Sequence, residues 1–402
     1  MAEGSANILG VCVMFSDLWV FGIAVLFVAV NGFSMLAWAA AQGYKMKPTA
    51  FAFLIGAVGN LLTGSITPIS GQSSILTVSH FMKNVNERIM ALLIAVLVMI
   101  PLGLSGAVTR IADFAGPAVV QGMMAGVGLM VAGISFDMFR QARRTGAISF
   151  ISALAAHAIF LGNPHALVYV VAISVTLATI DFTLLQKDPE TGKRGRRIDL
   201  LKLSQADGYV GDMAQNDNPK FWTKAYWADF KIMKPKFSFY AVYFALAFIS
   251  LNIGTNIAFG NITAGFAGTT QNMDHLTVIN SLADIPSVLF GGAPVGAIIS
   301  ATAAAPWPVM AGVVMMLLCA LLLLLGLMTK AVKYVPVQAI AGFLFIIGFF
   351  STFVPNLGRA FGTGYTAQAS AAMALTALTK NPFIGLVAGV LVRYIGTHFG
   401  LM

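Results

Sequence analysis

Charged residues are scarce in this chain of 402 residues, and cysteine is scarcer still. Only 10% of the residues are charged, whereas a soluble domain carries about 25%, and this shortage excludes an ordinary soluble globular protein. Cys12 and Cys319 are the two cysteines, too few for a disulfide framework or a cysteine-based metal site. The apolar tracts also lack clustered histidines, carboxylate pairs and nucleophile–base sets, which argues against an enzyme, a bound metal or an organic cofactor.

Apolar residues fill the chain instead and make up 58% of it. Because a membrane helix needs about 20 apolar residues, the sequence predicts an all-α polytopic membrane protein with about 14 transmembrane segments. The predicted segments are 18–42, 48–64, 66–82, 88–109, 114–138, 145–162, 165–185, 238–262, 275–291, 293–305, 307–328, 334–354, 365–379 and 382–399. They form two repeats of seven, residues 1–185 and 237–402, around a hydrophilic basic linker, 186–236. The net charge of +9 then favours loops facing anionic lipid over nucleic acid.

Two of these segments are interrupted by residues that a lipid-facing helix would not contain. Residues 64–75 read GSITPISGQSSI, and residues 287–308 read SVLFGGAPVGAIISATAAAPWP. Glycine, proline and hydroxyl residues at membrane depth predict backbone that leaves the helix where protein or water can satisfy it. Interrupted segments at corresponding places of two halves are typical of a transporter's central site. Close helix packing through small residues is the competing interpretation.

The two halves also resemble each other and a known family. Residues 102–129 and 325–349 both run from Gly-Leu through basic residues and a proline to a glutamine and a glycine-bearing helix, which favours an internal repeat. The chain resembles the nucleobase–ascorbate transporter (xanthine/uracil permease) family over nearly its whole length, in the stretches NLLTGSITPISGQSSI (60–75), SLNIGTNIAFG (250–260), FGGAP (290–294) and LGLMTKAVKYVPVQAIAG (325–342). The resemblance implies a seven-plus-seven inverted repeat with broken segments three and ten, core and gate domains, and a dimer. Sulfate-permease-like anion transporters share that architecture.

The chain departs from that family where the family places groups for base recognition and proton coupling. Leu251, Asn280 and Ser300 occupy the three positions at which the resemblance implies acidic residues or a glutamine. The resemblance therefore implies the fold more firmly than it implies nucleobase uptake by proton symport.

Polar residues at the breaks and on nearby segments are the candidates for a solute site. Amides and hydroxyls beside helix ends of positive partial charge favour a neutral polar solute or a small anion. The candidates are Asn31, Gly71, Gln72, Ser73, Ser74, Asn252, Thr255, Asn256, Gly296, Ser300 and Thr302. Asp284, an acid predicted at mid-bilayer, and Asn280 are the candidates for coupling to an ion. Hydrogen bonds between neighbouring helices are the alternative role for each of these residues.

The linker has features of its own. Trp222, Tyr226, Phe230 and Met233 recur at helical spacing among lysines and predict an interfacial amphipathic helix on lipid headgroups; docking on a partner protein is the alternative. The loops that follow odd-numbered segments hold most of the basic residues, Arg88 among them. This bias places the linker in the cytoplasm, whereas the family resemblance implies the opposite orientation.

Taken as a whole, the pattern predicts a secondary transporter or facilitator of a small polar solute, nucleobase-like or a small anion. We expect it in the cytoplasmic membrane, as a homodimer or in a membrane complex. The alternative is a transport-inactive membrane subunit that has kept the fold and holds partners. A solute between the two broken segments would favour the first function, and large apolar contacts to another chain would favour the second.

Overall fold

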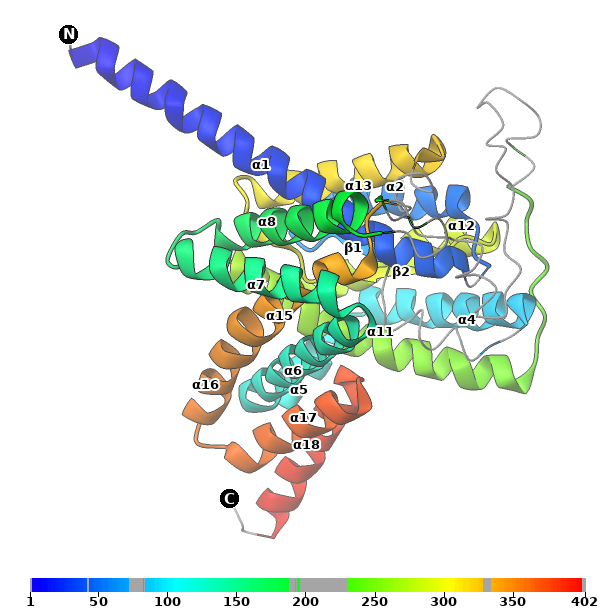
Figure 1. Ribbon diagram of the computed structural model, residues 1–402. Helices are drawn as coiled ribbons and strands as arrows, with labels where there is room; N and C mark the ends of the chain where they lie inside the picture. The colour runs from blue at the N-terminus through cyan, green and yellow to red at the C-terminus, as the bar shows by residue number, and fades with distance from the viewer. Residues whose placement is uncertain are drawn as a thin grey trace.

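The computed structural model describes residues 2–41, 43–71, 84–187, 230–327 and 334–399, together with residues 82, 192, 194, 195 and 227. Nearly all of this part of the chain is helical (Figure 1). The helices long and apolar enough to cross a bilayer are Met46–Thr63, Val85–Leu104, Pro117–Gln141, Ala166–Leu185, Phe239–Phe266 and Val337–Gly362, and shorter apolar helices accompany them. The chain is therefore an all-α polytopic membrane protein, as its composition predicts.

The elements follow the predicted segments closely. The first half contains α1 (Ala2–Ala41), α2 (Met46–Thr63), β1 (Ile69–Gly71), α4 (Val85–Leu104), α5 (Ala107–Ala115), α6 (Pro117–Gln141), α7 (Arg143–Ile159), α8 (Ala166–Ile180) and the π-helical turn η1 (Asp181–Leu185). The second half contains α11 (Phe239–Phe266), α12 (Met273–Leu289), β2 (Val295–Ala297), the 3-10 turn η3 (Ala301–Ala304), α13 (Pro308–Leu324), η4 (Val337–Ile340), α15 (Ala341–Phe345), η5 (Ile346–Phe353), α16 (Val354–Gly362), α17 (Thr366–Thr379) and α18 (Pro382–His398).

Several boundaries differ from the prediction, among them the end of the segment predicted as 334–354, which continues to Gly362. Helix α1 begins at Ala2 rather than at residue 18, and its first part projects away from the body (Figure 1). The predicted segment 88–109 is two helices, because Gly106 has a positive φ of 71° and separates α4 from α5. A strongly amphipathic sequence makes α5 a short helix of its own rather than a continuation of a membrane span.

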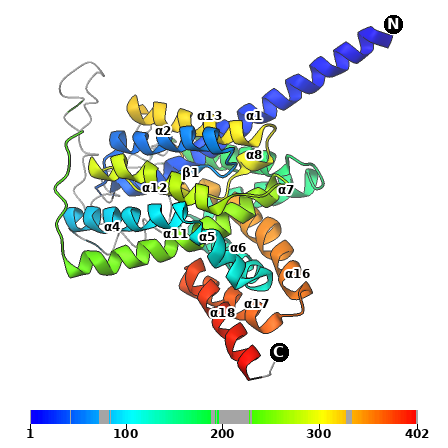
Figure 2. The same cartoon turned by 180° about the vertical axis from the view of Figure 1, so that it is seen from behind.

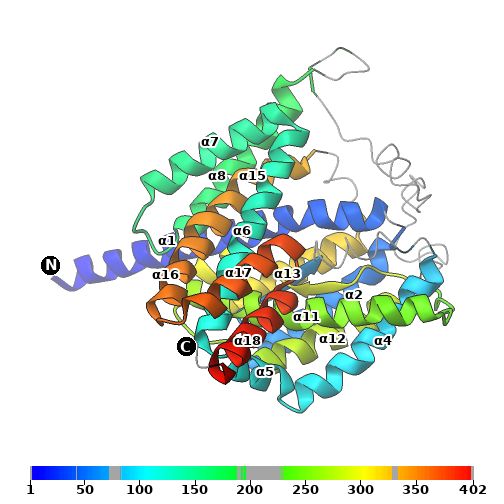
Figure 3. The same ribbon diagram turned by 90° about the horizontal axis from the view of Figure 1, so that it is seen from below.

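The helices pack in two groups. Helices α2, α4, α11, α12 and α13 lie together (Figure 2), and α2, α11 and α12 contact the two strands. Helix α6 packs on α17, α18 and the long helix from η4 to α16 (Figure 3). In this second group Gly122 and Gly126 of α6 lie directly against the backbone of Ala369 and Met373 on α17, which is the close approach expected between membrane helices.

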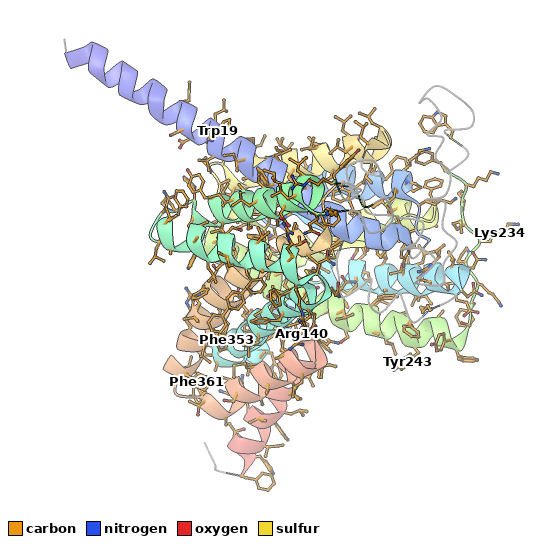
Figure 4. The ribbon with its side chains drawn as sticks, in the orientation of Figure 1. Trp19, Arg140, Lys234, Tyr243, Phe353 and Phe361 are labelled. Atoms are coloured by element: carbon orange, nitrogen blue, oxygen red, sulfur yellow. The ribbon has the colours of Figure 1, made fainter. Side chains whose placement is uncertain are left out.

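Large apolar and aromatic side chains cover the outside of both groups. Trp19 is 71% exposed and Tyr243 is 66% exposed, and both lie at the periphery in Figure 4. Because the chain is a membrane protein, an apolar exterior of this kind is the surface that contacts lipid.

The structure corrects two predictions about charged and aromatic residues. Arg88 is not a loop residue: it lies in the first turn of α4, fully buried, with its guanidinium 4.3 Å from the centre of the Tyr44 ring. Residues 230–238 are not helical, so the predicted interfacial helix does not include Phe230 or Met233. The Phe230 ring packs on Phe51 of α2, and the Met233 N–H donates to the Leu289 carbonyl (2.8 Å). This end of the linker therefore docks on the protein, while Trp222 and Tyr226 lie outside the described residues.

Candidate functional site

Both predicted helix breaks are present, and neighbouring side chains satisfy the backbone that each one frees. After α2 the chain turns at Gly64 and runs without helix to the end of β1. Asn60 Nδ2 donates to the Thr67 carbonyl (2.9 Å), and Gln271 Oε1 accepts from the Ile66 N–H (3.2 Å). Backbone at this depth needs such partners because lipid supplies none.

The second break begins after α12 and is held by three side chains. Thr49 Oγ1 accepts from the Ala293 N–H (2.8 Å), and Ser287 Oγ donates to the Ala293 carbonyl (2.8 Å). Asp284 Oδ1 accepts from the N–H of Val295 (2.7 Å), the first residue of β2. A Cβ atom at Gly292 would lie 2.5 Å from Ser287 Oγ and 2.7 Å from the Thr49 backbone nitrogen. The FGGAP stretch therefore needs glycine here because two other elements touch its backbone.

The two breaks meet as a pair of antiparallel strands. Ile69 pairs with Ala297, Ser70 with Gly296, and Gly71 with Val295. The predicted site residues Gly71 and Gly296 thus lie on the two paired strands, β1 and β2, and we call this strand pair the strand crossing. Helices α1, α2, α11 and α12 all contact this pair. Hydrogen bonds between the two strands replace the helix hydrogen bonds that are lost where glycine and proline interrupt the helices.

Ser70, at the middle of the crossing, was not among the predicted site residues. Its side chain is buried, with 3% of the residue exposed, and its Oγ atom has no hydrogen-bond partner among the described residues. A buried hydroxyl without a partner costs free energy, so this position is a ready donor for a bound molecule. Its position between Pro68 and Gly71 is the feature of the sequence that could have identified Ser70 as a site residue.

A chain of hydrogen bonds joins α12 to α11 next to the second break. Asn280 Nδ2 donates to Asn256 Oδ1 (2.8 Å), and Asn256 Nδ2 donates to Thr277 Oγ1 (3.0 Å). Thr277 in turn donates to the Met273 carbonyl (2.8 Å), which can only accept. This last bond fixes the direction of the whole chain, so Asn280 presents its Oδ1 atom at the free end, buried and without a partner in the described part of the protein.

These residues line a small polar cavity between α4, α11 and α12. Its volume is about 10 Å³, room for about one water molecule. The lining residues are Val96, Met99, Asn252, Asn256, Asn280, Ser281 and Asp284. Four of the predicted site residues, Asn252, Asn256, Asn280 and Asp284, therefore come together.

The remaining candidates do not join this cavity. Thr255 donates to the Leu251 carbonyl of its own helix (2.8 Å). Ser300 Oγ lies 2.7 Å from Thr302 Oγ1 and accepts from the Thr302 N–H (3.2 Å), so these two residues cap η3. Gln72, Ser73 and Ser74 lie outside the described residues. Asn31 lies on α1, but the position of its side chain is not among those described. Within the described part of the chain no cluster of histidine, cysteine, aspartate and glutamate side chains could hold a metal ion.

Comparison with known proteins gives distant structural likenesses, two of which are described here. No family model and no curated protein matches the chain. The transmembrane domain of a cyanobacterial bicarbonate transporter, BicA, is 16% identical with a TM-score of 0.47, covering 94% of this chain and 98% of that one. SLC26A9 is 12% identical with a TM-score of 0.49, covering 99% of this chain and 70% of that one. At this distance the likenesses assign the chain to no family.

Proposed function

We propose that the chain is a secondary transporter or facilitator of a small polar solute. The observation that carries this function is the strand pair β1–β2, formed where two helix breaks meet among apolar helices. Both breaks forgo helix hydrogen bonds, and Asn60, Gln271, Thr49 and Asp284 are required to satisfy the freed backbone. A membrane protein with a purely structural role could span the bilayer with continuous helices. Unwound backbone among packed helices is the arrangement by which transporters expose polar groups to a solute.

The solute classes to test first are small anions and nucleobases. The crossing offers the hydroxyl of Ser70, which has no hydrogen-bond partner in the described part of the chain, and the backbone of Gly71 and Gly296 lies in the strand pair itself. These neutral groups suit a compact polar molecule that accepts hydrogen bonds.

A binding screen tests this proposal. We would measure the melting temperature of the purified protein with bicarbonate, sulfate, uracil or xanthine. A ligand that binds only the folded state raises that temperature, by an amount that grows with the ratio of its free concentration to its Kd. Ser70→Ala should weaken binding about 5-fold, the equivalent of one lost neutral hydrogen bond.

Ser174→Ala is the matched control for this screen, because Ser174 is also a buried serine but its hydroxyl donates to the Val170 carbonyl (2.7 Å) of its own helix. Equal affinities for Ser70→Ala and the wild type would remove Ser70 from the site. Failure of every solute to stabilise folded wild type would overturn the proposal.

A second candidate function rests on α1. The beginning of this helix projects from the body (Figure 1), and Leu18 and Trp19 are 58% and 71% exposed. In this second function the surface would contact another chain, either a second copy or a different membrane subunit, instead of lipid. Mass measurement of the protein extracted in mild detergent tests it: a stable heteromeric complex together with the absence of solute binding would favour a transport-inactive subunit.

A further inference from the structure

We propose that the cavity between α4, α11 and α12 binds one small monovalent inorganic cation, and that Asp284 links its occupancy to strand β2. This site is separate from the strand crossing, and its cation binding can be measured whether or not the protein transports a solute.

The first step is the direction of the hydrogen bonds around the cavity. Asn280 Oδ1 has no donor among the described residues, because the chain of hydrogen bonds through Asn256 fixes the Asn280 amide group in the opposite sense. The Ser281 hydroxyl donates to the Thr277 carbonyl (2.8 Å), which leaves the lone pairs of Ser281 Oγ available. Asp284 uses Oδ1 for the Val295 N–H, and the described part of the protein provides no hydrogen bond to Oδ2. The cavity therefore presents three acceptor atoms, Asn280 Oδ1, Ser281 Oγ and Asp284 Oδ2, that receive no hydrogen bond from the described residues, and these atoms favour a cation or a donor.

The second step is the balance of charge. Asp284 is only 5% exposed, and no basic residue lines the cavity. A buried carboxylate without a counter-charge is strongly disfavoured, so Asp284 is neutralised either by a proton or by a bound cation. One monovalent cation neutralises it, whereas a divalent cation would leave an uncompensated positive charge in an apolar bundle.

The third step is the size and chemistry of the space. A cavity of about 10 Å³ holds one species about the size of a water molecule, which excludes an organic ammonium ion. Carboxylate, amide and hydroxyl oxygens are the ligands preferred by hard cations. Asp284 Oδ2, Asn280 Oδ1 and Ser281 Oγ are such oxygens, and the half-buried Asn252 also lines the cavity with an amide.

The fourth step is the link to the strand crossing. One carboxylate group serves both places: Oδ1 holds the first N–H of β2, and Asp284 lines the cavity. A cation at Oδ2 fixes the position of the carboxylate and with it the Val295 N–H. Val295 pairs with Gly71, so the occupied cavity stabilises the crossing itself.

The test compares sodium and potassium chloride with choline chloride at equal ionic strength. We expect purified wild type to bind radioactive Na⁺ or K⁺ saturably with a stoichiometry of one, and its melting temperature to rise with the concentration of that ion but not with choline. Hydrogen exchange of the β2 segment should slow in the same salt.

Asp284→Asn should abolish all three effects, and Asn280→Ala should weaken ion affinity about 10-fold. Asp137→Asn is the matched control, because Asp137 is an exposed acid paired with Arg140 at 3.6 Å, away from the cavity. If Asp284→Asn does not fold, the ion affinity of Asn280→Ala tests the proposal instead. Wild type that shows no saturable Na⁺ or K⁺ binding holds only a water in the cavity, and either this result or unchanged binding in the folded variants overturns the proposal.

Discussion

The two helix breaks differ in the side chains that form hydrogen bonds to their non-helical backbone. At the first break, neutral amides satisfy the freed backbone: Asn60 comes from the preceding helix and Gln271 from the loop before α12. At the second break, a hydroxyl of α2 and a carboxylate of α12, Thr49 and Asp284, hold the chain. The amide pair makes the first break a fixed scaffold. Under the cation binding proposed above, the carboxylate would make the second break responsive to charge, because the occupant of the neighbouring cavity would act on the same side chain.

The largest expected difference between the breaks lies at their glycines. Gly292→Ala places a methyl group against the Thr49 backbone and should destabilise the protein by about 3 kcal/mol, as overpacking does. Gly64→Ala has open space around it and a φ of 68°, so it should cost only about 1 kcal/mol of backbone strain. The yield of monodisperse protein and the melting temperature check this order. Equal losses for the two variants would mean that the second break is no more tightly enclosed than the first.

The next largest effect concerns the neutral scaffold of the first break. Gln271→Ala leaves the Ile66 N–H without its acceptor and should lower the free energy of unfolding by about 2 kcal/mol. Gln141→Ala is the control, because its hydrogen bond to Gln338 is exposed, and it should change stability by less than about 0.5 kcal/mol. Similar melting temperatures for both variants would remove Gln271 from its proposed role.

The smallest of these effects separates the charge of Asp284 from its hydrogen bond. In choline buffer, Asp284→Asn keeps an oxygen that can accept from the Val295 N–H, whereas Asp284→Ala does not. We therefore expect the alanine variant to be less stable than the asparagine variant by about 1 kcal/mol. Thermal unfolding in the absence of Na⁺ and K⁺ measures the difference. A more stable alanine variant would show that the bond to β2 contributes little.

Much of the fold could be predicted because its signals are local. Proline and glycine around Pro68 and Pro294 mark both breaks, and long apolar runs mark the helices. The spacing of four between Asn252 and Asn256, and between Asn280 and Asp284, also predicts two polar helix faces.

The pairing of those faces depends on contacts distant in sequence, and here the sequence was less informative. Nothing local shows that Asn280 meets Asn256 or that Gln271 reaches the first break. Phe230 was assigned to lipid for the same reason: its packing on Phe51 joins segments far apart in the chain.

Solute uptake by the purified protein in liposomes tests the central claim most directly. If the strand crossing is the site of a transporter or facilitator, wild type should show saturable uptake of one solute from the binding screen. Ser70→Ala should reduce uptake at low solute concentration about 5-fold, in line with one lost hydrogen bond, and Ser174→Ala should leave it unchanged. Wild-type liposomes that take up no more solute than empty ones, from protein shown to be folded, would contradict the account.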